Sequence, residues 1–350
     1  MRVLIDTTYA VREPLSGTGV YIRKLCQELE RSGELELVQT ANRGRRAPAG
    51  GGAGSVKNLL GDLRWTWLEL PRIAARERVD LIHHPLPARA PRSSVPQVIT
   101  VADLAFERLP ECFDRGFRTY AHFSHRAAAR GAVAVVCVSQ TTASDVRELW
   151  GIPAERIVVA AHGPGQDLAR SGAGEEPEPA SDPEHFLYVG DAEPRKNLGT
   201  LIAGYRLYRD GVDRPLPLVL AGSAVIQADG VLVERHPSPA RLAMLYGAAA
   251  ALIQPSLYEG FGLTVLEAMS LGTPVLAARS PGLTEVCGEA ALWAEPRSAE
   301  SFAQALTRLH LEAPLRAALA ERGRARAAGF SWAGCARDHI SAYSLAVSGA

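Results

Sequence analysis

Short β-branched runs alternate with longer amphipathic stretches in two separate series along the 350-residue chain. The first series begins at Val3–Asp6 and ends at Ile157–Ala160, and the second begins at His185–Gly190 and ends at Ala291–Trp293. Strands that alternate with helices in this way form parallel sheets covered by those helices. A single hydrophobic core rarely grows beyond about 250–300 residues. The chain is therefore predicted to form two doubly wound, Rossmann-like α/β domains.

The predicted domain boundaries follow the places where this rhythm is lost. We expect an N-terminal domain over residues 1–162, a linker over 163–184 and a C-terminal domain over 185–330. The linker collects Gly, Pro, Ser and acidic residues, which is the composition of a flexible connection. A final helix within 331–350 has no strand after it, and we expect it to cross back onto the first domain. Doubly wound sheets bind ligands at the carboxyl ends of their strands, so a ligand cleft shared by the two domains is predicted.

Composition excludes several classes of protein. Hydrophobic residues make up 47% and charged residues 22% of the chain, and the formal net charge is zero. These values fit an ordinary globular protein and not the basic stripe of a nucleic-acid binder. No apolar run approaches the roughly 20 residues of a transmembrane helix, and no signal-peptide pattern opens the sequence, so we expect a cytoplasmic protein. The five cysteines lack CxxC spacing, which argues against zinc sites and a disulfide framework.

Two glutamates flank a glycine turn in the string PSLYEGFGLTVLEAM. Glu259 precedes an expected helix and Glu267 lies within it. The glycines allow a ligand close to the backbone, and the N–H groups around Gly262, Leu263 and Thr264 form a natural phosphate site at a helix N-terminus. One carboxylate can then accept the hydroxyls of a ribose while the other meets a sugar held before the turn. An isolated pair of glutamates would be better interpreted as two solvated surface charges. The whole string around these two glutamates favours a ligand site instead.

Extended to PSLYEGFGLTVLEAMSLGTPVLA, the string resembles the nucleotide-binding signature of the family 4 retaining glycosyltransferases, which have the GT-B fold. The resemblance covers nearly the whole second domain through Tyr188–Leu198, Leu220–Gly222, Leu245–Ala249, Pro281–Glu285 and Phe330–Trp332. The first domain matches more loosely, through Gly17–Tyr21 and Asp103–Phe106. The resemblance implies transfer of a sugar from a nucleotide diphosphate donor to a hydroxyl of a glycan, lipid-linked or small-molecule acceptor. It also implies retention of the anomeric configuration.

Roles for single residues follow from the same resemblance. It implies that Arg195 and Lys196 neutralise the donor diphosphate, that Glu267 binds the ribose, and that Glu259 and Asp103 lie beside the reacting sugar. Fixed cations aimed at a departing diphosphate stabilise the transition state more than the ground state. Lys196 is one of only three lysines in the chain, which agrees with a specific role. We expect no metal ion and no cofactor other than the donor substrate.

Gly17 and Gly19 follow the first predicted strand and open a helix, where they would let the first domain approach the diphosphate. A lone GxG is weak evidence, because a glycine turn between strand and helix explains it nearly as well. It lacks the third glycine and the acidic strand end of a dinucleotide fingerprint, which disfavours an NAD-dependent dehydrogenase. Asp191 and Glu193 superficially form a metal-binding DxD motif, but they lie in the loop leading to Arg195, and we expect no metal there.

Two positions depart from the family pattern. Asp191 stands where many relatives have an arginine, which leaves fewer cations at the phosphate. Ala102 precedes Asp103 where relatives usually have a histidine that reaches the donor sugar near its 6-hydroxyl. Either the natural donor lacks a 6-hydroxyl, as a 6-deoxyhexose or a pentose does, or the enzyme is slow or inactive. We favour the changed donor, because the charged residues of the site persist.

A different class of function stays open. The chain could be a non-catalytic glycosyltransferase-like partner protein that retains the nucleotide pocket. The region Phe113–Arg130 mixes aromatic and basic residues, a pattern compatible with weak peripheral membrane contact, although we prefer a packed helix with a solvated basic face. We expect no nucleic-acid partner. The sequence does not determine the donor base and sugar, the acceptor or the oligomeric state.

Overall fold

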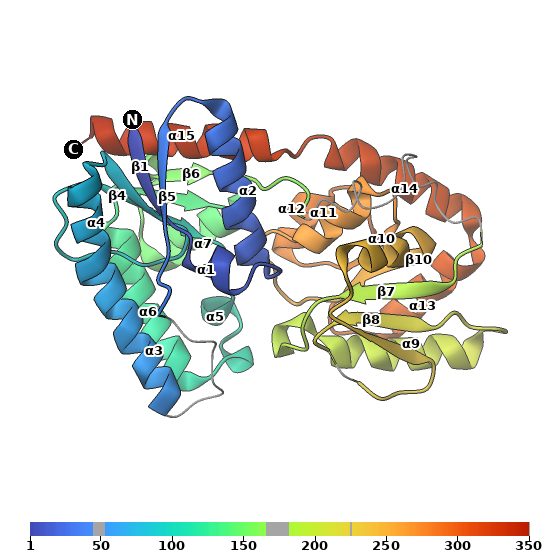
Figure 1. Cartoon of the computed structure of the whole chain (residues 1–350). Coiled ribbons are helices and arrows are strands. Elements are labelled where there is room, and N and C mark those ends of the chain that lie inside the picture. Colours follow the sequence, from blue (N-terminus) through green and yellow to red (C-terminus); the bar gives the residue numbers. More distant parts are fainter. Residues whose placement is uncertain (45–52, 166–181, 225, 350) are drawn as a thin grey trace. The chain divides into compact units, whose positions relative to one another are not determined.

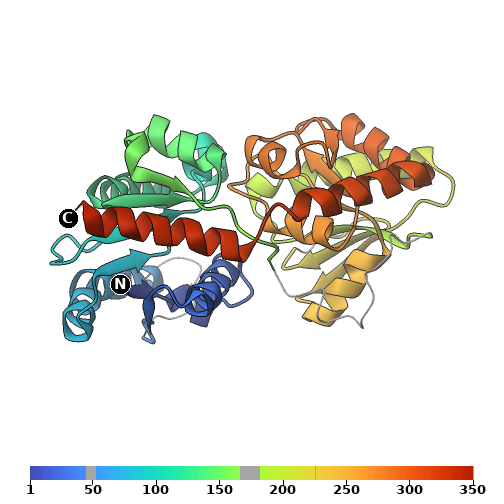
Figure 2. The same ribbon diagram turned by 90° about the horizontal axis from the view of Figure 1, so that it is seen from above.

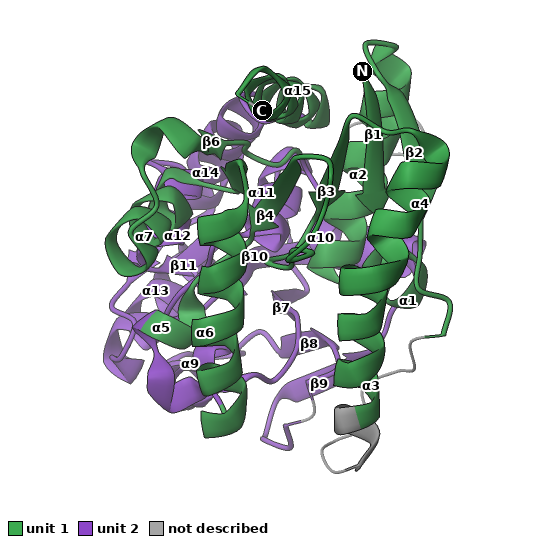
Figure 3. Cartoon of the chain, turned by 90° about the vertical axis from the view of Figure 1, so that its left-hand side faces the viewer, with its two compact units in different colours: residues 1–107, 114–163, 332–350 green, residues 108–113, 164–331 purple. Residues whose placement is uncertain are grey.

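The computed structural model describes residues 1–44, 53–165, 182–224 and 226–349, with the backbone alone for 53–56. The chain divides into two compact units (Figure 1, Figure 3). Unit 1 contains residues 1–107, 114–163 and 332–350, and unit 2 contains residues 108–113 and 164–331. The short segment 108–113, which lies inside the predicted N-terminal domain, thus belongs with unit 2.

Unit 1 is built on a six-stranded parallel sheet in the order β2-β1-β3-β4-β5-β6. Its strands are β1 (Arg2–Asp6), β2 (Glu36–Thr40), β3 (Leu81–His84), β4 (Gln97–Val101), β5 (Ala134–Cys137) and β6 (Ile157–Val159). Strands β3, β4 and β5 are buried along their whole length, as expected for central strands covered on both faces. The chain runs from β1 to β2 and then returns to the other side of β1 to form β3.

Helices connect these strands in the predicted alternating order. They are α1 (Thr8–Arg12), α2 (Gly17–Ser32), α3 (Ala53–Arg64), α4 (Leu70–Glu77), α5 (Ala105–Arg108), α6 (Arg115–Gly131) and α7 (Gln140–Trp150). A π-helical segment, η1 (Trp65–Glu69), joins α3 to α4, so the helical stretch from Ala53 to Glu77 is not regular throughout. The indole N–H of Trp65, which is buried, donates a hydrogen bond to Asp6 Oδ2 (2.9 Å) at the end of β1.

The last helix, α15 (Trp332–Ser348), belongs to unit 1. It packs against α2 and against β3, β4, β5 and β6, and Figure 2 shows it lying over the strands of this unit. Helix α15 thus completes the core of unit 1, although it is more than 170 residues from β6 in the sequence.

A buried polar network joins α15 to the sheet of unit 1. The Tyr21 hydroxyl is hydrogen-bonded to Thr100 Oγ1 and to His339 Nε2, both at 2.8 Å. The Tyr343 hydroxyl is bonded to His83 Nδ1 (2.8 Å), and His83 Nε2 is bonded to the same Thr100 oxygen (2.9 Å). Pairing of this kind is what allows polar side chains to be buried without a large free-energy cost.

Unit 2 has a second six-stranded parallel sheet, in the order β12-β11-β10-β7-β8-β9. Its strands are β7 (His185–Val189), β8 (Leu218–Gly222), β9 (Val231–Arg235), β10 (Ala249–Gln254), β11 (Val275–Ala278) and β12 (Leu292–Ala294). The helices are α9 (Leu198–Gly211), α10 (Pro239–Ala248), α11 (Leu263–Ser270), α12 (Pro281–Cys287), α13 (Ala299–Leu311) and α14 (Ala313–Ala327). The strand series predicted from the sequence is confirmed in both halves.

Short 3₁₀ turns complete the secondary structure: η2 (Pro110–Cys112), η3 (Ala154–Arg156) and η4 (Pro194–Lys196). Most of the predicted linker, residues 166–181, lies outside the described residues. Among the helices that the structure describes, none is both long and apolar enough to cross a membrane.

Candidate active site

The strand order of unit 2 reverses between β7 and β10, and the loops that follow these two strands lie side by side. The chain passes from β7 to β8 and β9, then returns to the other side of β7 to form β10. Ligands of doubly wound sheets bind at the carboxyl ends of the strands where the order reverses. Arg195 and Lys196 follow β7, and Glu259 follows β10, so three of the predicted site residues meet at this switch point.

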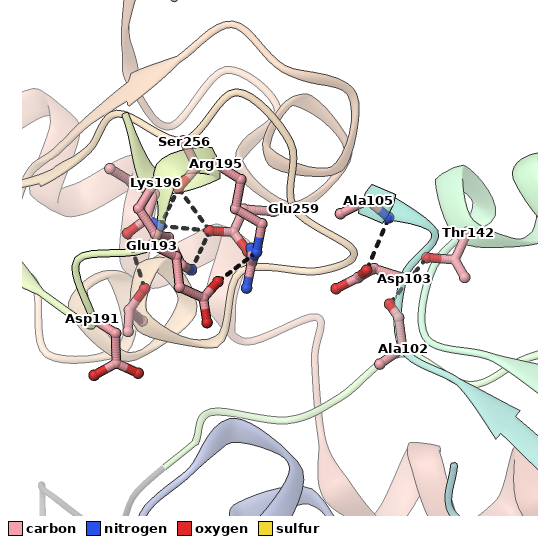
Figure 4. A network of polar contacts seen from close by, with 12 residues as sticks. Ala102, Asp103, Ala105, Thr142, Asp191, Glu193, Arg195, Lys196, Ser256 and Glu259 are labelled. Atoms are coloured by element: carbon pink, nitrogen blue, oxygen red, sulfur yellow. Dashed lines mark hydrogen bonds and ion pairs between the residues drawn. The ribbon is translucent and has the colours of Figure 1, made fainter. Parts of the chain in front are cut away.

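Glu259 is the centre of a dense network of hydrogen bonds and ion pairs (Figure 4). Its Oε1 atom accepts hydrogen bonds from Lys196 Nζ (2.6 Å), Gln254 Nε2 (2.8 Å) and Ser256 Oγ (2.8 Å). Its Oε2 atom accepts one from Arg195 Nη1 (3.2 Å). Only 7% of Glu259 is exposed, so this is a buried carboxylate with a donor set fixed around it. Glu259 is therefore not the solvated loop residue that an isolated glutamate would suggest.

The electrostatic balance of the network keeps Glu259 ionised. Burial raises the pKa of the carboxyl group, but the charges of Lys196 and Arg195 outweigh burial and lower this pKa to about 2. Hydrogen bonds to the ionised form act in the same direction. Together with Glu193, which pairs with Arg195 Nε (2.8 Å), the network holds two carboxylates and two cations.

The loops that follow β7 and β10 are also joined by hydrogen bonds that involve their backbones. The Leu257 N–H donates to the Arg195 carbonyl (2.9 Å), and the Asn197 side-chain amide donates to the Pro255 carbonyl (3.1 Å). Asn197 itself has a left-handed backbone with φ of 56°, a conformation that asparagine tolerates better than most residues. These bonds hold the cations and the carboxylate in one arrangement before any ligand arrives.

Helix α11 begins directly after this network. Gly262 caps it with φ of 105°, in the region that side-chain-bearing residues rarely adopt. The first turn of a helix leaves N–H groups without intrahelical partners, so Leu263 and Thr264 lie where an anion would be bound. The Thr264 hydroxyl donates to Gln254 Oε1 (3.1 Å), which links the helix start to the Glu259 network.

Glu267 lies one turn further along α11 and is 5% exposed. One carboxylate oxygen, Oε2, accepts a hydrogen bond from the Tyr246 hydroxyl (3.1 Å). The other, Oε1, lies so close to Gly165 that a β-carbon on that residue would overlap with it. The chain at Gly165 thus approaches this one oxygen closely, which only a glycine permits.

The predicted site residues of unit 1 make local contacts. Gly17 opens α2, and a β-carbon on Gly19 would overlap with the backbone carbonyl of Glu13, so packing alone requires that glycine. Asp103 Oδ1 accepts a hydrogen bond from the Ala105 N–H (2.9 Å) at the start of α5 (Figure 4). Their roles toward the donor stay predictions.

Ala102 has an exposed side chain in unit 1, and its carbonyl accepts a hydrogen bond from Thr142 Oγ1 (3.3 Å).

The acidic residues of the DxD-like segment are engaged within unit 2. Glu193 forms an ion pair with Arg195 Nε (2.8 Å), and Asp191 accepts a hydrogen bond from the Ser223 hydroxyl. No group of three or more potential metal ligands gathers anywhere in the described parts of the chain.

Three residues of the site were missed by reasoning from the sequence. Gln254 and Ser256 donate to Glu259, and Tyr246 donates to Glu267. Gln254 carries a signal that could have been used, since it is a polar residue at the end of an otherwise apolar strand. Tyr246 lies 21 residues before Glu267, and its only signal is its place in Leu245–Ala249, one of the segments that carry the family resemblance.

Two family models cover most of the chain. Residues 15–163 match Glycosyltransferase Family 4, and residues 174–326 match Glycosyl transferases group 1. A relative in Escherichia coli, O-antigen chain mannosyltransferase B, is 28% identical over 98% of this chain and 99% of its own length. These matches identify the chain as a member of the group 1 glycosyltransferase family. The protein is a glycosyltransferase.

Solved structures place the fold in the GT-B class. Sucrose-phosphate synthase from Thermosynechococcus elongatus superimposes with a TM-score of 0.77 at 19% identity, with full coverage of both chains. Anabaena HepE in complex with UDP and glucose superimposes with a TM-score of 0.70 at 16% identity, over 98% of this chain and 99% of that one. The predicted fold class of two Rossmann-like units is thereby confirmed.

Proposed function

We propose that this glycosyltransferase moves a sugar from a nucleoside diphosphate donor to an acceptor hydroxyl with retention of the anomeric configuration. The observation that carries the proposal is the buried Glu259 held between Lys196 and Arg195, directly before the first turn of α11. A single site thus offers both a carboxylate for a sugar that gains positive charge and cations for a diphosphate that gains negative charge.

In the proposed reaction the bond between the anomeric carbon and the diphosphate oxygen breaks, and Lys196 and Arg195 stabilise the charge that develops on the diphosphate. The acceptor oxygen forms a bond to the same face of the anomeric carbon, and its proton passes to the departing phosphate oxygen. Glu259 remains ionised and stabilises the positive charge of the sugar ring. Glu267 accepts the ribose hydroxyls. No protein nucleophile, metal ion or further cofactor takes part.

A retaining transfer has a direct test. The purified protein is incubated with a set of nucleotide sugars and with glycan and lipid fractions as acceptors, and products are found by mass spectrometry. Proton NMR of the first-formed product then reports its anomeric configuration. We expect a product with the configuration of the donor. An inverted product would overturn retention alone, whereas binding of nucleotide without transfer or donor hydrolysis would favour the non-catalytic alternative.

The donor sugar is proposed from Ala102. An exposed methyl group, where family members usually have a histidine, suits a donor that lacks a 6-hydroxyl. The name of the Escherichia coli relative, a mannosyltransferase, instead favours an ordinary hexose. GDP-mannose and its 6-deoxy counterpart GDP-rhamnose form a matched pair for comparison. A higher kcat/KM with the deoxy sugar supports the proposal, and robust transfer of mannose with no gain for its 6-deoxy form contradicts it.

Helix α6 supports a second proposal, a weak contact with an anionic lipid surface. Phe117, Tyr120 and Phe123 are 44%, 41% and 68% exposed, so the outer face of α6 is more apolar than a packed helix with a solvated basic face would be. Its sequence, RGFRTYAHFSHRAAARG, contains four arginines and no acidic residue. Exposed aromatic rings beside cations are the pattern of helices that lie at membrane interfaces.

Co-sedimentation with vesicles tests this contact. We expect the protein to bind vesicles that contain phosphatidylglycerol more strongly than vesicles of phosphatidylcholine alone. Phe123→Ser should reduce that binding severalfold. The control is Met244→Ser on α10, an equally exposed apolar residue of unit 2 (65%), which should leave binding unchanged. Equal loss in both variants would contradict a role of α6.

A further inference from the structure

Gln254 is the last residue of β10 and is only 1% exposed. A buried amide is costly unless both of its ends are paired. Its Nε2 atom lies 2.8 Å from Glu259 Oε1 and 3.0 Å from Ser256 Oγ, and its Oε1 atom lies 3.1 Å from Thr264 Oγ1. Gln254 therefore bridges the carboxylate of the site and the first turn of α11.

The direction of each hydrogen bond in this bridge follows from Glu259. An ionised carboxylate can only accept hydrogen bonds, so the amide must turn its NH₂ group toward Glu259. Its carbonyl oxygen then faces Thr264 and can also only accept. The Thr264 hydroxyl must therefore donate, and because a hydroxyl has one proton, that proton is committed to Gln254.

We propose that Gln254 is a positioning residue that fixes Glu259 relative to α11 and makes the Thr264 hydroxyl an acceptor toward the donor substrate. An acceptor oxygen does not suit a phosphate, so the diphosphate is held by the backbone N–H groups at the start of α11 and by the two cations. The Thr264 lone pairs instead suit a hydroxyl group of the transferred sugar. The assignment of these ligands rests on the proposed function, whereas the direction of the hydrogen bonds does not.

Gln254→Glu tests the contact between Gln254 and Glu259 without any assumption about activity. The new carboxyl group would lie about as close to Glu259 as Gln254 does (2.8 Å), and two carboxylates at that distance share one proton. The pKa of the pair in the folded protein should then exceed that of an unfolded glutamate. A group with a raised folded pKa stabilises the protein at low pH and ceases to do so as pH rises through that pKa. We expect the variant to melt near wild type at pH 5 and well below it at pH 8.

One variant serves as the control for this melting experiment. Gln254→Leu cannot share a proton, so its loss of melting temperature should be the same at both pH values. If Gln254→Glu loses the same melting temperature at pH 5 and pH 8, the proposed bridge from Gln254 to Glu259 is wrong.

Thr264 tests the ligand assignment. Thr264→Val removes the hydroxyl but keeps the backbone N–H, so calorimetric affinity for the bare nucleoside diphosphate should change less than about twofold. Transfer should fall more than that affinity, and Thr264→Ser should restore it. A tenfold loss of nucleoside diphosphate affinity in Thr264→Val would overturn the assignment, because it would mean that the hydroxyl donates to phosphate. If no transfer is detected at all, the proposed function fails while the melting result still decides the role of Gln254.

Discussion

Both units have a six-stranded parallel sheet whose strand order reverses beside its first strand, yet these two reversal points hold different chemistry. In unit 2 the loops after β7 and β10 bring Lys196, Arg195 and Glu259 into direct contact. In unit 1 the corresponding strands are β1, which ends in Asp6, and β3, which ends in His83 and His84. Asp6 accepts hydrogen bonds from Thr8 and Trp65, and His83 belongs to the neutral network beneath α15. The reversal point thus gathers charged side chains in unit 2 and structural hydrogen bonds in unit 1.

The buried network of unit 1 and the Glu259 network of unit 2 also differ in protonation state. Burial lowers the pKa of His339 to about 4, so this histidine is neutral in the folded protein at neutral pH. Burial would also neutralise Glu259, but paired cations keep it charged. Charged groups held out of water are costly to maintain and are common at functional sites. We infer that the charges of unit 2 serve a ligand, whereas the neutral network of unit 1 serves stability.

The largest expected effect is the loss of turnover on substitution of Glu259, which should differ from the effect of substituting Glu267. Glu259→Ala should lower turnover by about 10²–10³, the range seen when a group that stabilises a transition-state charge is removed. Glu267→Ala should instead weaken the binding of the nucleoside diphosphate, because the proposed ribose contact is present before the reaction. Calorimetry with the bare nucleotide and steady-state kinetics measure the two effects separately. Loss of nucleotide binding in Glu259→Ala, with binding intact in Glu267→Ala, would reverse the assigned roles.

The stability of the two units should depend differently on acid pH. The pKa of His339 is about 4 in the folded protein and near 6.5 when unfolded. A histidine with a lowered folded pKa stabilises the protein above its unfolded pKa and ceases to do so as pH falls. The loss between pH 6.5 and 4 is worth about 3 kcal/mol, at about 1.4 kcal/mol for each pKa unit. The pKa of Glu259 is lowered to about 2, so the stability that its ionised carboxylate contributes to the folded protein is lost only below pH 4.5.

Hydrogen exchange read along the chain checks this difference. Between pH 7 and pH 5, after correction for intrinsic exchange rates, amides of α15 should lose protection while those of α11 keep theirs. Helix α11 serves as the control within the same molecule. Earlier loss of protection in α11 would mean that the charged network, and not the histidine network, is the acid-sensitive part.

A smaller effect is expected when one cation of the site is removed. Lys196→Ala should lower kcat/KM by roughly 10- to 100-fold, because Arg195 remains to stabilise the diphosphate. Lys24→Ala removes a lysine of α2 in unit 1 and should change activity much less. Lys57→Ala, at an exposed position of α3, provides a second control that does not disturb packing. Equal rates for Lys196→Ala and the two controls would remove Lys196 from the proposed mechanism.

The sequence alone predicted the fold better than it predicted the contacts within the site. Alternation of apolar runs and helices is a local property, so β7 and β10 could be located from the residues themselves. Their adjacency is not local, because it depends on strand order. Reasoning from the sequence therefore placed Glu259 and Lys196 at one donor without predicting that they pair directly. The bond between Tyr21 and His339 joins residues 318 positions apart, and no pattern in either segment signals it.

The smallest effect concerns a single hydroxyl group of the neutral network. Tyr343→Phe keeps the buried ring but removes the bond to His83 Nδ1 (2.8 Å), which leaves that nitrogen without its Tyr343 partner in an apolar environment. Such a change costs about 1–3 kcal/mol, so the free energy of unfolding should fall by that amount. Because His83 and Tyr343 belong to the structural network of unit 1, KM for the donor and kcat should stay within about twofold of wild type. Urea unfolding and steady-state kinetics on the same preparation measure both quantities. A large loss of turnover with unchanged stability would contradict the division between a structural network in unit 1 and a ligand site in unit 2.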